Sequence, residues 1–163
     1  MTDQPQVLER LKSDHDRQRE LLDQIAQTSG DSQERRDLFT ELTKELKGHA
    51  AAEEQAVYSE MLAEPEVSDE TRHSVAEHHE IDEMLNDLAA TDMSSSAWMQ
   101  KFKQLDDRYR HHIEEEEEDH FPDFAEQISD EQDEEMVQIF DERKEAEKDA
   151  AEVTPEKMDD AKE

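Results

Sequence analysis

The sequence predicts an all-α protein, an up-down-up-down antiparallel four-helix bundle followed by a short C-terminal helix and an acidic tail. Two glycines and four prolines in 163 residues are too few for a turn-rich β fold. Four long segments carry apolar residues at helical spacing, which is the pattern of an amphipathic helix. The joints between these segments are short, and short joints favour antiparallel neighbours.

Helix-breaking and capping residues set the expected bounds of each element. A Ser-Gly-Asp-Ser turn at residues 29–32 separates the first two helices, Pro65 ends the second, and a serine run at residues 94–96 precedes the fourth. The fourth is expected to end at Phe121, because the residue before a proline avoids the helical region. The four predicted helices cover residues 5–28, 32–63, 68–91 and 97–120.

The C-terminal part of the chain is weaker in apolar residues. A fifth helix is expected from Ser129, with Met136 and Phe140 among its apolar positions. Beyond Arg143 the sequence has nothing large to bury, so the last twenty or so residues are expected to be frayed or disordered. The predicted organisation is a bundle over residues 1–128, with the fifth helix and the disordered acidic tail over residues 129–163.

The formal net charge of −31 restricts the possible partners. Nucleic acid and anionic membrane surfaces would be repelled, so neither is expected to bind. Self-repulsion should also destabilise the folded chain at low salt. One hypothesis is adaptation to a salty interior, where screening is strong; the alternative is an acidic surface kept for solubility. A monomer or weak oligomer is expected.

Several classes of protein are excluded by what the sequence lacks. It has no cysteine, which removes disulfides, thiolate metal sites and cysteine catalysis. No apolar stretch approaches the roughly 20 residues of a membrane span. The N-terminus has no apolar core of a secretory signal. The cytoplasm is the default expectation for location.

A duplicated pattern of histidine and glutamate is the main functional signal. His15, His49 and Glu53 recur at one offset of 63 residues, as 15 to 78, 49 to 112 and 53 to 116. Apolar positions around them recur at the same offset, as expected for an internal duplication. In each half, the second histidine begins a His-x-x-x-Glu, which places both side chains on one helix face. The candidate ligands are therefore His15, His49, Glu53, His78, His112 and Glu116.

The predicted bundle brings these six side chains together. Each histidine lies about the same number of residues from its joint, so at a rise of about 1.5 Å per residue all four fall in one layer. Both glutamates lie on apolar stripes without an evident arginine or lysine partner, and burying an unpaired carboxylate is costly. The set suits one or two metal ions. Imidazole with carboxylate favours iron, with manganese and zinc behind it.

The motifs resemble those of the haemerythrin-like HHE cation-binding domains. The resemblance covers about residues 5–127 and implies a four-helix bundle with two non-haem iron ions, in which Glu53 and Glu116 bridge the irons. It also implies a small diatomic or peroxide ligand. The segments that carry the resemblance are Asp14-His15, His49-Ala-Ala-Ala-Glu53-Glu54, Ala76-Glu77-His78-His79-Glu80-Ile81-Asp82 and His112-Ile-Glu-Glu-Glu116-Glu117, followed by Phe121-Pro122.

Where the oxygen-carrying members carry His-x-x-x-x-Asp in the fourth helix, this chain has His112-x-x-x-Glu116. It also departs from these members at one position of the third helix. They place a further histidine one turn before the third-helix ligand, and here that position is Ser74. The departure argues against stable reversible oxygen carriage and favours redox chemistry, sensing or iron handling. His120 returns to the inward face and is expected around the site, as a neighbour of the ligands or as a substitute ligand. Tyr109 is expected to fill the core, and its hydroxyl could donate a hydrogen bond near the metals. His73, His79 and His111 are expected at the surface.

The sequence leaves three functions open. The first is a haemerythrin-like di-iron protein that binds or reacts with dioxygen, peroxide or nitric oxide, for binding, sensing or detoxification, with a catalase-like or other oxidant-consuming activity possible. The second is iron storage, delivery or repair of iron centres. The third is a structural metal-binding bundle that acts as an interaction module.

Overall fold

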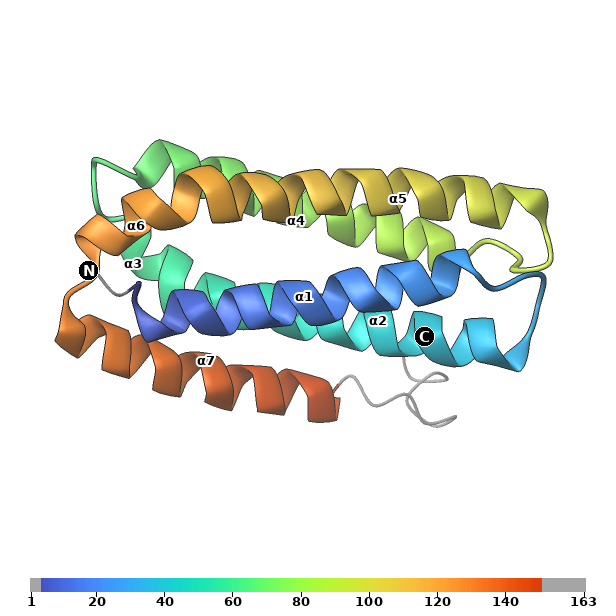
Figure 1. Cartoon of the computed structure of the whole chain (residues 1–163), viewed down its shortest axis with the longest axis horizontal. Helices are drawn as coiled ribbons and strands as arrows, with labels where there is room; N and C mark the ends of the chain where they lie inside the picture. Colours follow the sequence, from blue (N-terminus) through green and yellow to red (C-terminus); the bar gives the residue numbers. More distant parts are fainter. Residues whose placement is uncertain (1–3, 151–163) are drawn as a thin grey trace, which may run out of the picture.

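Four long antiparallel helices form the body of the protein. The computed structural model describes residues 4–150. Within that range the helical pair α1 and α2 lies against the pair α4 and α5 (Figure 1), and no strand is present. The predicted all-α bundle is confirmed. The four helices are α1 (Gln6–Ala26), α2 (Gln33–Glu53), α4 (Ser68–Ala89) and α5 (Ser96–Glu115).

Two of these helices continue through a π-helical turn. Helix α2 runs into η1 (Glu54–Tyr58) and α3 (Ser59–Met61), and α5 runs into η2 (Glu116–His120) and α6 (Phe121–Gln127). A π-helical turn inserts a residue into an α-helix and often lies at a functional site. Here each turn adjoins one of the two predicted glutamate ligands, Glu53 and Glu116, and nothing in the sequence predicts it.

The expected helix end at Phe121 is wrong. Phe121 is helical, with φ −62° and ψ −41°, and the chain continues through Pro122 as α6. The π-helical turn ends just before this point, so Pro122 stands in the first turn of α6. A proline is tolerated there because the backbone N–H that it lacks would have no intrahelical partner.

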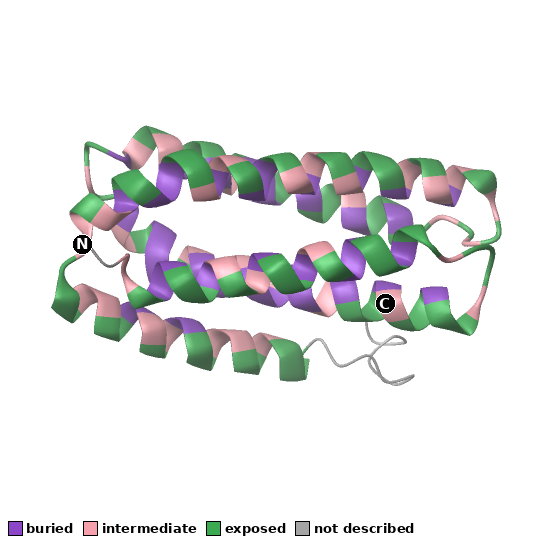
Figure 2. Cartoon of the chain, in the orientation of Figure 1, coloured by how far each residue is buried: buried purple, intermediate pink, exposed green. Residues whose placement is uncertain are grey.

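Buried residues line the inward faces of the four long helices (Figure 2). The hydrophobic ones among them form two clusters, and a polar layer separates the clusters. Along α1, for example, Leu11 belongs to one cluster and Leu21 to the other, and the buried His15 and Gln18 lie between them. The same order, read in the other direction, holds along α2, where Leu46 and Ala52 belong to different clusters and His49 lies between them. The layer between the clusters therefore holds the predicted ligands and keeps them away from both ends of the bundle.

The C-terminal helix α7 (Asp130–Ala150) packs on the outside of α1 and α2 (Figure 1). Met136 and Phe140 are buried in the cluster that also holds Leu11. Fraying beyond Arg143 was expected, but α7 stays helical to Ala150 because Lys144 forms ion pairs with Asp14 at 2.6 Å and Glu45 at 3.2 Å. The rest of the predicted tail, residues 151–163, lies outside the described residues.

Asp133 ties α7 to the start of α1. Its carboxylate accepts hydrogen bonds from the backbone N–H groups of Gln6 and Val7, each at 2.8 Å, and so caps α1 from a distant segment. Replacing Asp133 by alanine is expected to lower the free energy of unfolding by about 1 kcal/mol. Chemical denaturation measures this, and Glu131→Ala, an exposed acidic residue in the same helical turn, is the matched control. Equal losses in the two variants would contradict the capping role.

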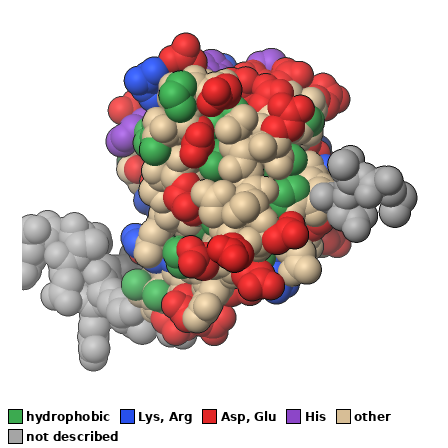
Figure 3. All heavy atoms as spheres, turned by 90° about the vertical axis from the view of Figure 1, so that its left-hand side faces the viewer, with side chains coloured by type: hydrophobic (Ala, Val, Ile, Leu, Met, Phe, Trp, Pro, Cys, Tyr) green, Lys and Arg blue, Asp and Glu red, His purple; other side chains and the backbone are tan. Residues whose placement is uncertain are grey.

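The surface is strongly acidic. Figure 3 views the end of the bundle that carries α6 and the turn between α3 and α4, and it shows groups of Asp and Glu side chains with few Lys or Arg among them. In the described part of the chain, no helix has both the length and the apolar character needed to cross a bilayer.

Candidate metal centre

The six predicted ligand side chains lie together in the buried layer. Their exposed fractions range from 0 to 8%, and His78 is the most exposed. The imidazoles form two pairs: the ring centroids of His15 and His49 are 5.1 Å apart, and those of His78 and His112 are 5.0 Å apart. One pair comes from α1 and α2 and the other from α4 and α5, so the two halves of the duplicated sequence face each other.

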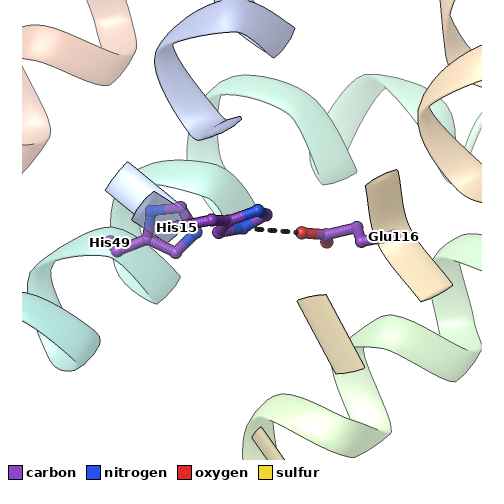
Figure 4. A group of neighbouring side chains, drawn as sticks. All are labelled: His15, His49 and Glu116. Carbon is purple, nitrogen blue, oxygen red and sulfur yellow. Dashed lines mark ion pairs between the residues drawn. The ribbon is translucent and has the colours of Figure 1, made fainter. Parts of the chain in front are cut away.

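Two carboxylates span the gap between the imidazole pairs. Glu53 Oε1 lies 3.6 Å from His49 Nε2 and 3.2 Å from His78 Nε2. Glu116 Oε1 lies 3.2 Å from His15 Nε2, and its Oε2 lies 4.0 Å from His112 Nε2. Figure 4 shows Glu116 of η2 reaching toward His15 of α1, with His49 beside it. Each carboxylate thus contacts one imidazole of each pair, which is the arrangement that two bridged metal ions require.

Four further carboxylates orient the imidazoles from outside. Each bonds the Nδ1 atom of one histidine, so Nδ1 carries the proton and the Nε2 lone pair faces inward. Two of these carboxylates, Asp14 and Glu77, directly precede ligand histidines and lie 63 residues apart. The other two, Glu54 and Glu117, directly follow ligand glutamates and are separated by the same offset, so the duplication could have revealed all four. The pairs of these outer carboxylates are Asp14 with His49 at 2.8 Å, Glu54 with His78 at 3.2 Å, Glu77 with His112 at 3.0 Å and Glu117 with His15 at 2.7 Å.

The inner atoms of this centre lack partners of their own. His15 Nε2, both oxygens of Glu53 and one oxygen of Glu116 are buried without a hydrogen bond. With Nδ1 protonated, His15 Nε2 and Glu116 Oε1 are two acceptors facing each other at 3.2 Å. Among residues 4–150, no lysine or arginine forms an ion pair with Glu53 or Glu116. Such an arrangement favours cations between the acceptors, and the residues therefore fit a metal site.

The pKa values of His15, Glu53 and Glu116 show which of these side chains bind protons in the metal-free protein. Burial alone would lower the pKa of His15, but the adjoining Glu116 and Glu117 carboxylates raise it to about 9. Burial and the nearby Glu116 carboxylate raise the pKa of Glu53 well above its ordinary value. Burial would also raise the pKa of Glu116, but His15 and His112 hold it well below. Protons on His15 and Glu53 thus stabilise the metal-free centre.

The metal-free protein is expected to lose stability as the pH rises. Since the pKa of His15 is raised from 6.5 to about 9, its contribution is complete below pH 6.5 and is lost as the pH passes 9. The raised pKa of Glu53 acts in the same direction. The melting temperature of chelator-treated protein should fall by several degrees between these pH values. A curve that is flat or rises over this range would contradict the assignment.

The neighbouring residues surround the inner layer. Ser74 and His120 are buried and bond each other, Ser74 Oγ to His120 Nδ1 at 3.0 Å, and His120 Nε2 lies 3.3 Å from Glu115. Tyr109 fills the core as expected, with its ring centroid 6.0 Å from that of His112, and its hydroxyl donates a hydrogen bond to Gln18. The Tyr58 hydroxyl donates to Glu116 Oε2.

The remaining histidines lie at the surface, as expected. His73 has a side-chain exposure of 52% and His111 of 65%, and His79 is also exposed. Two further side chains of the acidic run from residue 114 to 118 contact histidines: Glu117 orients His15, and Glu115 contacts three other histidines.

Comparison with known proteins shows the family of this chain. The family model of the hemerythrin HHE cation-binding domain matches residues 6–124, which include all six candidate ligands. The chain belongs to the haemerythrin HHE family. No curated protein matches this haemerythrin-like chain.

A solved structure extends the family relation to α7. The crystal structure of a hemerythrin HHE cation-binding domain-containing protein, the Rv2633c homolog from Mycobacterium kansasii, is similar to this chain with a TM-score of 0.76. The two sequences are 26% identical, and the similarity covers 92% of this chain and 90% of the other. The haemerythrin-like architecture thus includes more than the family model spans.

Proposed function

We propose that this haemerythrin-like chain is a non-haem di-iron protein that binds or reacts with dioxygen, peroxide or nitric oxide. The strongest support is the arrangement of the buried layer. Two buried carboxylates lie between two pairs of imidazoles, and the inner atoms of this group have no hydrogen-bond partners. His15, His49, His78 and His112 would hold the two ions, with Glu53 and Glu116 shared between them. When bound, iron supplies the redox chemistry and the binding of the small molecule. Manganese and zinc are the second choices for this ligand set.

The protein side chains would keep the centre oriented and dry. The Tyr58 hydroxyl holds one oxygen of Glu116, and burial together with Glu116 and Glu53 raises the pKa of Tyr58, so it stays a hydrogen-bond donor. Phe140 of α7 covers His49 edge-on, with 6.1 Å between ring centroids, and Phe121 stacks on His15 at 5.9 Å. These rings close the centre on the side of α1 and α2.

The seam between α2 and α4 offers a path for a small molecule. A cavity of about 30 Å³ lies against His49, His78 and Tyr109, and it also contacts Ala50. A surface cavity of about 250 Å³ adjoins it and shares Ala50 and His78. This inner cavity has room for a diatomic molecule or peroxide, since a single water needs at least about 10–15 Å³. The size of the path therefore suits a small oxidant.

Blocking this seam should slow ligand access without removing metal. Ala50→Leu places a larger side chain where the inner and surface cavities meet, and an added barrier of about 1.4 kcal/mol slows access about tenfold. Stopped-flow mixing of the metal-loaded protein with azide measures the rate. Ala51 lines only the surface cavity, so Ala51→Leu is the matched control. Equal rates in both variants and the unmodified protein would exclude this path.

The reaction class can be tested directly on the ferrous protein. We expect mixing with peroxide under anaerobic conditions to oxidise the centre, and catalytic release of oxygen would identify a catalase-like enzyme. If each centre consumes only one equivalent of peroxide and the reaction then stops, the result would favour binding or sensing. Transfer of iron to a metal-free acceptor protein, without reaction with any of the three small molecules, would replace this proposal with iron storage or delivery.

A further inference from the structure

A second group of histidines and glutamates lies outside the inner layer, between α4 and the junction of α5 with η2. Glu115 Oε1 is 3.2 Å from His73 Nε2 and 3.3 Å from His120 Nε2. Glu77 Oε1 is 3.4 Å from the same nitrogen of His73. We name His73, Glu77, Glu115 and His120 the peripheral cluster. None of its members is among the six inner ligands.

The spacing of three of these side chains is that of ligands around one metal ion. Metal–nitrogen and metal–oxygen bonds of about 2.0–2.2 Å place the ligand atoms of a tetrahedral site roughly 3.3 Å apart. His73 Nε2 lies 3.4 Å from Glu77 and 3.2 Å from Glu115, close to this value, and one ligand atom each from His73, Glu77 and Glu115 lies within 4.8 Å of the others. His120 adjoins this group through Glu115, at 3.3 Å, and would complete it as a fourth ligand.

Two of the four side chains are also held in place by the fold. His120 has a side-chain exposure of 5%, and Ser74 bonds its Nδ1 atom, so its Nε2 atom is directed toward Glu115. Glu77 is 3% exposed and bonded to His112. His73, at 52%, leaves one side of the cluster open to solvent. An ion could therefore reach a site whose inner half is already formed.

We propose that the peripheral cluster is a second metal site, which takes one divalent transition ion such as Zn²⁺ or Fe²⁺. Two imidazoles and two carboxylates suit these ions, whereas Ca²⁺ and Mg²⁺ take oxygen ligands. The site adjoins the inner centre through Glu77, because its Oε1 atom also accepts the hydrogen bond of His112 Nδ1 at 3.0 Å. An ion on Glu77 would weaken that bond, so the inner centre would respond to occupancy of the peripheral site.

The test is a titration of the metal-loaded protein with Zn²⁺, followed by calorimetry and by metal analysis after gel filtration. The expected result is one further equivalent of zinc per chain, a change in the absorption of the inner centre and no loss of its metal. His73→Ala and Glu115→Gln should each weaken this binding at least tenfold while the inner metal stays. His79→Ala and Glu114→Gln, which alter exposed neighbours outside the cluster, should bind like the unmodified protein.

Three outcomes would overturn the proposal. The first is the absence of a further equivalent of zinc. The second is zinc that appears only as inner metal is lost, which would mean exchange in the inner centre. The third is equal binding by His73→Ala and His79→Ala, which would make the cluster a set of surface ion pairs. This titration is independent of which oxidant, if any, the inner centre meets.

Discussion

Replacing Glu116 by glutamine is expected to reduce the metal content from about two ions per chain to less than one. Glu116 belongs to both three-ligand groups of the inner centre, one with His15 and His49 and the other with His78 and His112. An amide has one neutral acceptor oxygen, and its NH₂ group cannot bind a cation. Loss of the shared ligand should therefore weaken binding at both positions, by more than the 10–100-fold typical of an orienting residue.

Metal analysis after dialysis against a weak chelator measures this loss. Glu118→Gln is the matched control. Glu118 is an exposed residue of the same π-helical turn, two positions after Glu116, and its substitution removes the same charge. The control separates the ligand role from a general effect of lowering the negative charge. A Glu116→Gln protein that keeps both ions would contradict the role of Glu116 as a shared ligand.

Removing the metal from the unmodified protein is expected to lower its melting temperature by roughly 10 °C. Ions present at about 1,000 times their dissociation constant stabilise the fold by about 4 kcal/mol, and each kcal/mol is worth about 2–4 °C in a chain of this size. The physical reason is that Glu53 and Glu116 are buried and have unpaired oxygens. Without metal, only protons can offset their negative charge. Both halves of the bundle supply ligands, so the loss affects the whole fold.

Differential scanning calorimetry with and without chelator at pH 8 measures the shift. The Glu116→Gln protein is the control, because a protein that holds little metal should melt at the same temperature under both conditions. If the unmodified protein also melts at one temperature, the ions do not support the fold, and a purely structural role for the metal fails.

The sequence was most informative where the duplication repeats both apolar and polar residues. Helical periodicity and short joints predicted the bundle, and the 63-residue offset identified the six inner side chains, which lie together in the buried layer. The same offset relates Asp14 to Glu77 and Glu54 to Glu117, so the outer carboxylates were within reach of the same reasoning. They were not predicted, because in a chain with 49 acidic residues an acidic side chain next to a ligand is indistinguishable from a solvated one.

Other features had no signal in the sequence. The π-helical turns shift the helix phase after Glu53 and at Glu116, and this shift decides where the residues that follow point. Helical spacing placed His120 on the inward face, and His120 is buried, but its contacts with Ser74 and Glu115 had no signal in the sequence. The contact of Lys144 with Asp14 joins residues far apart in the sequence, so local composition predicted fraying where tertiary ion pairs maintain a helix.

The central claim is that two ions share the inner centre through Glu53 and Glu116. Its most direct test is metal analysis of the protein purified from its native source, together with absorption spectra recorded in air and under anaerobic conditions. We expect about two iron ions per chain and a near-ultraviolet spectrum that differs between the two conditions. About one zinc ion per chain, with identical spectra in both conditions, would contradict it.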